Sequence, residues 1–177
     1  MASEEDEFTT LFQDFYPSLC RFLECLLGGR IALAQDLAQE SFLQLHRNAW
    51  GTLPPGEARF WLYRVARNFA INEFRKGQTR HKFFDRVVEV MSPRPRNPEA
   101  EYEKKEQQQL VLAMWQSLPE DQRVALLLRE QEQLSYREIG TVLNISESKV
   151  KVDIFRARTA LRENWTRRTR AHSNSLH

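Results

Sequence analysis

Hydrophobic residues recur at spacings of three and four along most of this chain, which predicts amphipathic helices. In the first such segment, residues 8–27, the pattern is interrupted only at Pro17, where a kink or a break is expected. Gly28 and Gly29 should end that helix. Only the run 87–91 is ambiguous with a strand, so the pattern predicts an all-α fold. Further helices are predicted over residues 31–50, 58–76, 99–117 and 121–131.

Proline and glycine divide the chain. Residues 51–56 (GTLPPG) are expected to form a loop, and residues 92–98 (SPRPRNP) have the composition of an extended linker. We therefore predict two small helical domains joined by a flexible linker. Their expected bounds are 1–86 for the first domain, 87–106 for the linker, 107–168 for the second domain and 169–177 for a disordered tail.

The last third of the chain predicts a helix-turn-helix. Ser135 and Glu138 have the spacing of a capping box that begins the first helix. Gly140 lacks a side chain where two helices could approach closely, and Asn144 suits a turn residue with left-handed backbone. Ser146 should cap the second helix. A basic second helix in such a motif is typical of a DNA reader.

The second helix has one apolar stripe, formed by Val150, Ile154, Ala157 and Leu161. Residues off this stripe are expected to point outward, and their hydroxyl and cationic groups suit phosphates and base edges of the major groove. These candidate DNA contacts are Ser148, Lys149, Lys151, Val152 and Arg156. The alternative is an amphipathic helical hairpin with a solvated basic face.

Charge is distributed unevenly along the chain. Residues 1–58 hold three Arg against nine Asp and Glu, a net of −6. Residues 59–86 hold eight Lys and Arg against two acids, a net of +6, and residues 146–177 hold eight against three, a net of +5. Two basic segments indicate two contacts with a polyanion, and an acidic segment could serve a protein partner.

The first of these basic segments interleaves aromatic residues with arginines (ARFWLYRVARNFAINEFRK, residues 58–76). Rings that stack on bases and cations that hold the backbone are what single-stranded nucleic acid binding requires. The alternative is structural, because Trp61, Leu62, Val65, Phe69 and Asn72 lie at helical spacing and much of that set is expected in the core. Most aromatics of this segment are therefore expected to be structural, whereas its arginines far outnumber the acids beside them.

Three motifs in this order resemble the extracytoplasmic-function (ECF) sigma factors of the sigma-70 family, over about residues 8–165. Residues 36–42 (DLAQESF) resemble the family's D-L-x-Q-E-x-F helix, and residues 60–68 (FWLYRVARN) resemble its F-x-W-L-y-r-I-A-x-N segment. Residues 135–162 resemble its C-terminal reader of the minus-35 element.

The resemblance implies a factor that binds core RNA polymerase and directs promoter-specific initiation in the cytoplasm. The first motif would dock on the clamp coiled coil of the largest subunit through Asp36, Gln39, Glu40 and an exposed Phe42. The implied contacts to the melted minus-10 element are Trp61, Arg64, Arg67, Asn68 and Arg75, with loop 51–57 trapping a flipped base. Further implied partners are the polymerase flap and an anti-sigma factor.

The chain departs from the family's usual recognition run, T-V-K-S-R-x-x-R-A-R. Val152 and Asp153 replace a hydroxyl and a cation. Asp153 would repel phosphate unless it pairs with Lys149 or Arg156, or accepts a hydrogen bond from cytosine. We therefore expect an unusual promoter preference.

Other classes of protein are disfavoured. No apolar run approaches the ~20 residues of a membrane span, and the acidic N-terminus is not a signal peptide. Cys20 and Cys25, five residues apart, suit neither a metal site nor a disulfide framework and are expected to be buried or half-buried thiols. No nucleotide, metal or nucleophile motif predicts an enzyme or a cofactor. The remaining alternatives are a stand-alone helix-turn-helix repressor or activator and an adaptor that binds only proteins.

Overall fold

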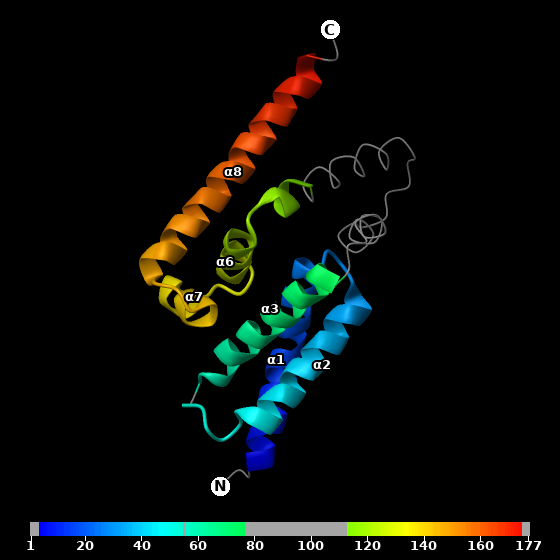
Figure 1. The fold of residues 1–177 in the computed structure, drawn as a ribbon, viewed down its shortest axis with the longest axis vertical. Helices are drawn as coiled ribbons and strands as arrows, with labels where there is room; N and C mark the ends of the chain where they lie inside the picture. The colour runs from blue at the N-terminus through cyan, green and yellow to red at the C-terminus, as the bar shows by residue number, and fades with distance from the viewer. Residues whose placement is uncertain (1–3, 55, 77–112, 175–177) are drawn as a thin grey trace. The chain divides into compact units, whose positions relative to one another are not determined.

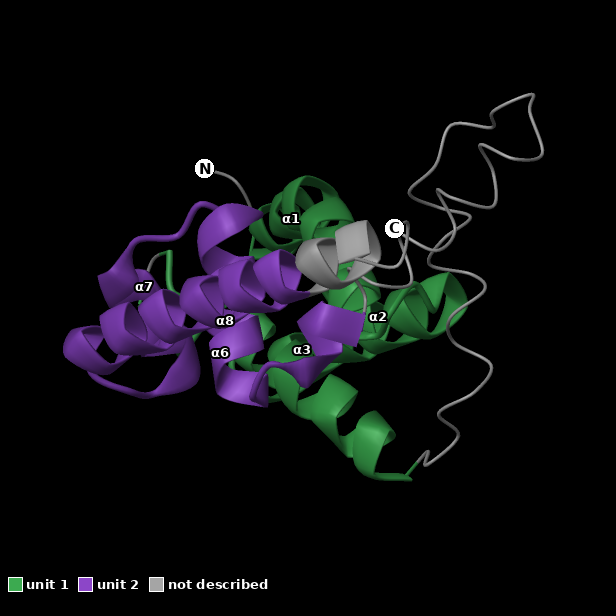
Figure 2. Ribbon diagram, turned by 90° about the horizontal axis from the view of Figure 1, so that it is seen from above, with its two compact units in different colours: residues 1–87 green, residues 88–177 purple. Residues whose placement is uncertain are grey.

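The structure is a computed structural model that describes residues 4–54, 56–76 and 113–174, with side chains described through residue 167. Within those residues it contains helices and no strand (Figure 1), which confirms the predicted all-α class. The chain divides into two compact units, residues 1–87 and residues 88–177, coloured separately in Figure 2. The expected linker, the ambiguous run 87–91 and the predicted helix start near residue 99 lie outside the described residues.

The first unit is a bundle of α1 (Glu4–Leu26), α2 (Ile31–Asn48) and α3 (Ala58–Lys76), each of which packs on the other two. Gly28 (φ 66°) and Gly29 (φ 85°) adopt left-handed backbone and end α1 as expected. Pro17 does not break α1, although it lies inside that helix. Its position is exposed, so water can satisfy the carbonyl that loses its helical donor.

The core of this unit shows how α3 is oriented. Of the apolar set predicted on α3, Leu62 is buried, and Trp61, Val65 and Phe69 are half-buried. The other buried residues of this helix are Tyr63, Ala66, Ala70 and Ile71. Asn72 is exposed, whereas Tyr63 packs edge-on against Phe15 and Phe22 at ring distances of 5.0 and 5.1 Å. Small alanines bring the α3 backbone close to its neighbours, and a search for large apolar residues overlooks them.

The second unit contains the helical residues 113–117, then α6 (Glu120–Glu130), α7 (Tyr136–Leu143) and α8 (Glu147–Asn174). Leu118 and Pro119 interrupt the helix before α6, as expected. The helices α6, α7 and α8 all pack on one another. Their shared core is fully buried at Val124, Leu128, Ile139, Val142, Val150, Ile154 and Ala157.

The start of α7 and the turn between α7 and α8 are both set by local chemistry that the sequence predicted. The Ser135 hydroxyl accepts a hydrogen bond from the Glu138 amide (3.2 Å), and the Ser135 amide donates to the Glu138 carboxylate (2.7 Å). Asn144 is left-handed, with φ 56° and ψ 46°. A Cβ at Gly140 would lie 2.7 Å from the Ile145 carbonyl oxygen, so glycine allows the two helices to approach.

The C-terminal end differs from the prediction. Residues 169–177 were expected to be a disordered tail, but α8 continues to Asn174 and extends past α6 and α7 (Figure 1). Residues 169–174 extend a helix already begun by a packed segment, and extending a helix is far less costly than nucleating one.

Candidate nucleic-acid and protein interfaces

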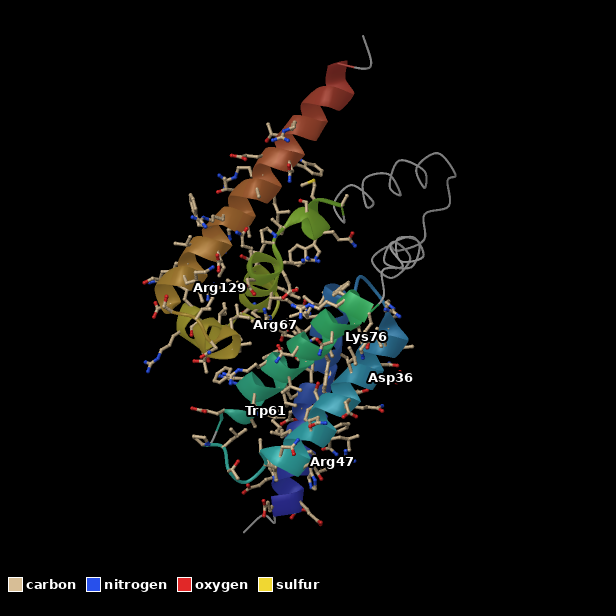
Figure 3. All side chains as sticks on the ribbon, in the orientation of Figure 1. Asp36, Arg47, Trp61, Arg67, Lys76 and Arg129 are labelled. Atoms are coloured by element: carbon tan, nitrogen blue, oxygen red, sulfur yellow. The ribbon has the colours of Figure 1, made fainter. Side chains whose placement is uncertain are left out.

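One face of α2 carries the predicted docking side chains. Asp36 and Gln39 are exposed and Glu40 is half-buried, and their spacing of three and four places them on one side of the helix. Glu40 accepts a hydrogen bond from the Gln44 amide at 3.1 Å. Gln39 lies 3.5 Å from the Tyr16 hydroxyl of α1. Figure 3 labels Asp36 and Arg47 on this helix.

Phe42 does not belong to that face, and the prediction of an exposed Phe42 was wrong. Its side chain is 2% exposed and packs against the rings of Phe12 (4.9 Å) and Phe8 (6.2 Å) from α1. Six residues after Asp36, the helical period of 3.6 turns residue 42 toward the bundle. The exposed large apolar residue beside that face is instead Leu43, at 47%, seven residues after Asp36 and three after Glu40. The same spacing in the sequence could have identified it.

The two thiols lie in different surroundings on α1. Cys20 is half-buried, as expected, and burial raises its pKa. Burial also raises the pKa of its neighbour Tyr16. Cys25 is exposed, contrary to expectation, because five residues along a helix turn it away from the face that holds Cys20.

The outer side of α3 carries the predicted minus-10 set. Trp61, Arg64 and Arg67 are half-buried, and Asn68 and Arg75 are exposed. Arg67 lies 3.4 Å from the Asn68 side-chain oxygen, within hydrogen-bonding distance. Figure 3 shows Trp61, Arg67 and Lys76 distributed along this helix.

Further aromatic and cationic groups lie near the two ends of α3. The Arg59 guanidinium lies 4.5 Å from the centre of the Phe60 ring, and Phe74 is 42% exposed. Tyr63 is an exception, since its ring is buried in the core. The segment therefore combines a structural aromatic with accessible aromatic and cationic groups.

The loop before α3 begins and ends with left-handed glycines, Gly51 (φ 78°) and Gly56 (φ 82°). The Thr52 hydroxyl donates to the Ala49 carbonyl at 2.8 Å, which fixes the start of the loop. Leu53 is half-buried, and Pro54 is exposed. Pro55 lies outside the described residues, so the expected capture of a flipped base in residues 51–57 stays a prediction.

The residues of α8 that were predicted to contact DNA are accessible. All five expected contacts are exposed: Ser148, Lys149, Lys151, Val152 and Arg156. The Ser146 hydroxyl accepts from the Lys149 amide at 3.2 Å, which confirms the predicted cap.

Acidic residues pair with two of the cations on this helix. Asp153 is 1% exposed and binds the Lys149 ammonium at 2.5 Å, so its carboxylate neither faces phosphate nor reaches a cytosine. Of the possibilities left open by the sequence, pairing with Lys149 is the one observed. Lys151 pairs with Glu147 at 2.9 Å, and both of these side chains are about half exposed.

A cation cluster at the start of α7 was not predicted. Arg129 and Lys151 lie 4.9 and 5.7 Å from the centre of the Tyr136 ring. Arg129 also donates to the Leu134 carbonyl at 2.8 Å, and Arg158 pairs with Glu130. These residues come from three helices, so spacing along the sequence gives no signal for the cluster.

The described part of the chain offers neither a metal site nor a membrane-spanning helix. No group of three or more His, Cys, Asp or Glu side chains there could hold a metal ion. No described helix is long and apolar enough to cross a membrane.

Each of the two units of the chain matches known proteins. Residues 11–80 match the family model for sigma-70 region 2, and residues 108–161 match that for sigma-70 region 4. The chain is 37% identical over 137 residues to the RNA polymerase sigma-H factor of Pseudomonas aeruginosa, covering 72% of this chain and 70% of that protein. It is 29% identical over 160 residues to the ECF RNA polymerase sigma factor SigM of Bacillus subtilis, covering 89% and 94%.

A solved structure has a similar fold. The sigma factor RpoE, in its complex with the anti-sigma factor NepR from Bartonella quintana, matches with a TM-score of 0.63 and 19% identity. The match covers 90% of this chain and 97% of that one. Both halves of the chain, in the same order, thus match one kind of protein: the chain belongs to the ECF sigma factors of the sigma-70 family.

Proposed function

We propose that this chain binds core RNA polymerase and directs promoter-specific transcription initiation. The observation that carries the proposal is the presence of both region 2 and region 4 in one chain, each within its own compact unit. A stand-alone repressor needs only the helix-turn-helix, and an adaptor that binds only proteins needs no basic recognition face.

In this proposal the first unit docks on the polymerase clamp through the exposed face of α2. Asp36, Gln39 and Glu40 supply its polar groups, and Leu43 supplies the apolar contact first assigned to Phe42. An acidic face with one accessible leucine is complementary to a basic helical surface, where rim charges set orientation and the buried apolar group gives affinity.

The same unit would open and hold the minus-10 element with α3 and loop 51–57. The accessible groups Trp61, Arg64, Asn68 and Arg75 recur at spacings of three, four and seven, so they lie along one side of the helix. Rings and cations along one side suit a single strand, because stacking contributes ~1–3 kcal/mol per base and the cations follow the backbone.

The second unit would read minus-35 duplex DNA with α8, through Ser148, Lys151, Val152 and Arg156. Lys149, paired with buried Asp153, contributes to the fold of the helix more than to the DNA contact. The chain would act in the cytoplasm, where core polymerase is found, and would contact the polymerase flap. An anti-sigma factor is a further proposed partner, suggested by the complex of the fold relative.

The test is in vitro transcription by core polymerase on the DNA upstream of the chain's own coding region. We expect a specific start site only when the chain is added. A pull-down with core polymerase measures polymerase binding, and a gel shift on duplex DNA alone measures DNA binding. Duplex binding without any binding to core polymerase would refute the proposal.

A further inference from the structure

Two apolar side chains stand in the middle of the recognition face of α8. Phe155 is 70% exposed and Val152 is 43% exposed. The helix does not need them for its core, because Val150, Ile154 and Ala157 on its other side are already fully buried. Exposed apolar groups that lie side by side indicate a binding surface.

Polar and cationic residues surround this apolar pair. Ser148 and Arg156 lie four residues before and after Val152, and Lys151 lies four residues before Phe155. On a helix these spacings make the five residues one continuous patch. The patch has an apolar centre of Val152 and Phe155 within a rim that can meet phosphates, and this charge pattern favours duplex DNA as its occupant.

Neither side chain of the apolar centre can donate or accept a hydrogen bond, so neither can read the polar edge of a base. Among the base pairs in the major groove, thymine presents an apolar group, its C5 methyl. We propose that Val152 and Phe155 are specificity-determining residues that contact thymine methyl groups in the minus-35 duplex. The inference rests on the proposed function and extends it to this chain's own base preference.

Val152 indicates which kind of base contact is favoured. The family's usual run has a serine hydroxyl here, which can hydrogen-bond to several bases, whereas Val152 gains only from an apolar neighbour. Asp153 beside it is buried and pairs with Lys149, so its carboxylate does not compete for a cytosine amine.

The experiment removes single methyl groups from the DNA. The full chain selects duplexes from a random library, and the selected duplex is remade with each thymine replaced in turn by deoxyuridine. Binding is measured by fluorescence anisotropy at fixed salt. Loss of one buried methyl should weaken binding about fourfold, and we expect this at one or two adjacent positions.

Val152→Ser and Phe155→Ala should abolish the difference between thymine and deoxyuridine at those positions. Trp165→Ala is the matched control, since it removes an exposed aromatic from the same helix outside the patch and should leave the difference intact. Circular dichroism checks that each variant is folded. The comparison of thymine with deoxyuridine for the wild-type chain involves no mutation and does not depend on that check.

Equal affinity of the wild-type chain for thymine and deoxyuridine at every position would overturn this inference alone. The inference would also be overturned if the variants bound the thymine duplex and the deoxyuridine duplex more weakly by the same factor. Variants that keep the methyl dependence but lose polymerase binding would overturn it too, and would assign the patch to a protein. A chain that binds no duplex, alone or with core polymerase, would overturn the proposed function together with this inference.

Discussion

Lys149→Ala should destabilise the second unit, although a lysine on a recognition helix invites the interpretation that it contacts DNA. The Asp153 carboxylate is 1% exposed and lies 2.5 Å from the Lys149 ammonium. Removing one partner of a fully buried pair costs ~3–5 kcal/mol, because a charge is left without compensation. The Lys149 side chain is 50% exposed, so water already screens the pair and a loss of ~2 kcal/mol is expected.

Native-state hydrogen exchange measured on peptides across α6, α7 and α8 tests this magnitude. A loss of ~2 kcal/mol corresponds to about 30-fold faster exchange of amides that open with the unit. Peptides from α1, α2 and α3 should not change. Peptide resolution is needed because a chain of two units has no single unfolding free energy.

Lys151→Ala is the matched control. Its pair with Glu147 is exposed on both sides, at 55% and 48%, and its ammonium lies 5.7 Å from the centre of the Tyr136 ring, so its loss should cost at most ~1 kcal/mol. Adding Asp153→Asn to Lys149→Ala should recover part of the protection, since it removes the buried charge. Protection of Lys149→Ala equal to wild type, or an equal loss in Lys151→Ala, would refute the reasoning.

Three further outcomes are expected. Asp36→Arg with Glu40→Arg should weaken core-polymerase binding by several kcal/mol in sum, with little change in thermal stability; a folded variant with native affinity would remove α2 from the interface. Lys151→Ala should weaken binding to minus-35 duplex and lower the salt slope by about one unit, whereas Asn68→Ala should spare duplex binding and impair open-complex formation; the same defect from both on a pre-melted template would contradict this division. Gly140→Ala should destabilise the second unit by ~1–3 kcal/mol in hydrogen exchange, because its Cβ would meet the Ile145 carbonyl at 2.7 Å; unchanged protection would show that the turn can relax.

The parts of the fold that the sequence predicts are those set by local chemistry. The capping box at Ser135, the left-handed Asn144 and the close approach at Gly140 each depend on residues a few positions apart. The same is true of the exposed cations on α8, because the buried stripe of that helix is apolar and regular. Local rules therefore identified the helix-turn-helix and its outer face.

The parts that were missed depend on how a helix is rotated against its neighbours. On α2 the buried face includes Ala34, Ala38 and Ser41, which carry little hydrophobic signal. Phe42 was expected to be exposed because the resemblance placed it in the docking motif, yet it is buried and its neighbour Leu43 is exposed. On α3 the predicted set shares Leu62 with the buried face but is otherwise offset from it by about one residue. The cluster around Tyr136 joins three helices, and only the tertiary structure brings such residues together.

The acids of α8 give its cations different roles in the proposed complex. Lys149 is held by a buried carboxylate and stays with the fold, whereas Lys151 can exchange exposed Glu147 for a phosphate at little cost. Glu147 and Asp153 also lower the net charge of the first two turns, which reduces sequence-independent attraction to DNA. A larger share of the discrimination then falls on base contacts. This is the setting in which an apolar centre of Val152 and Phe155 has the most influence on promoter choice.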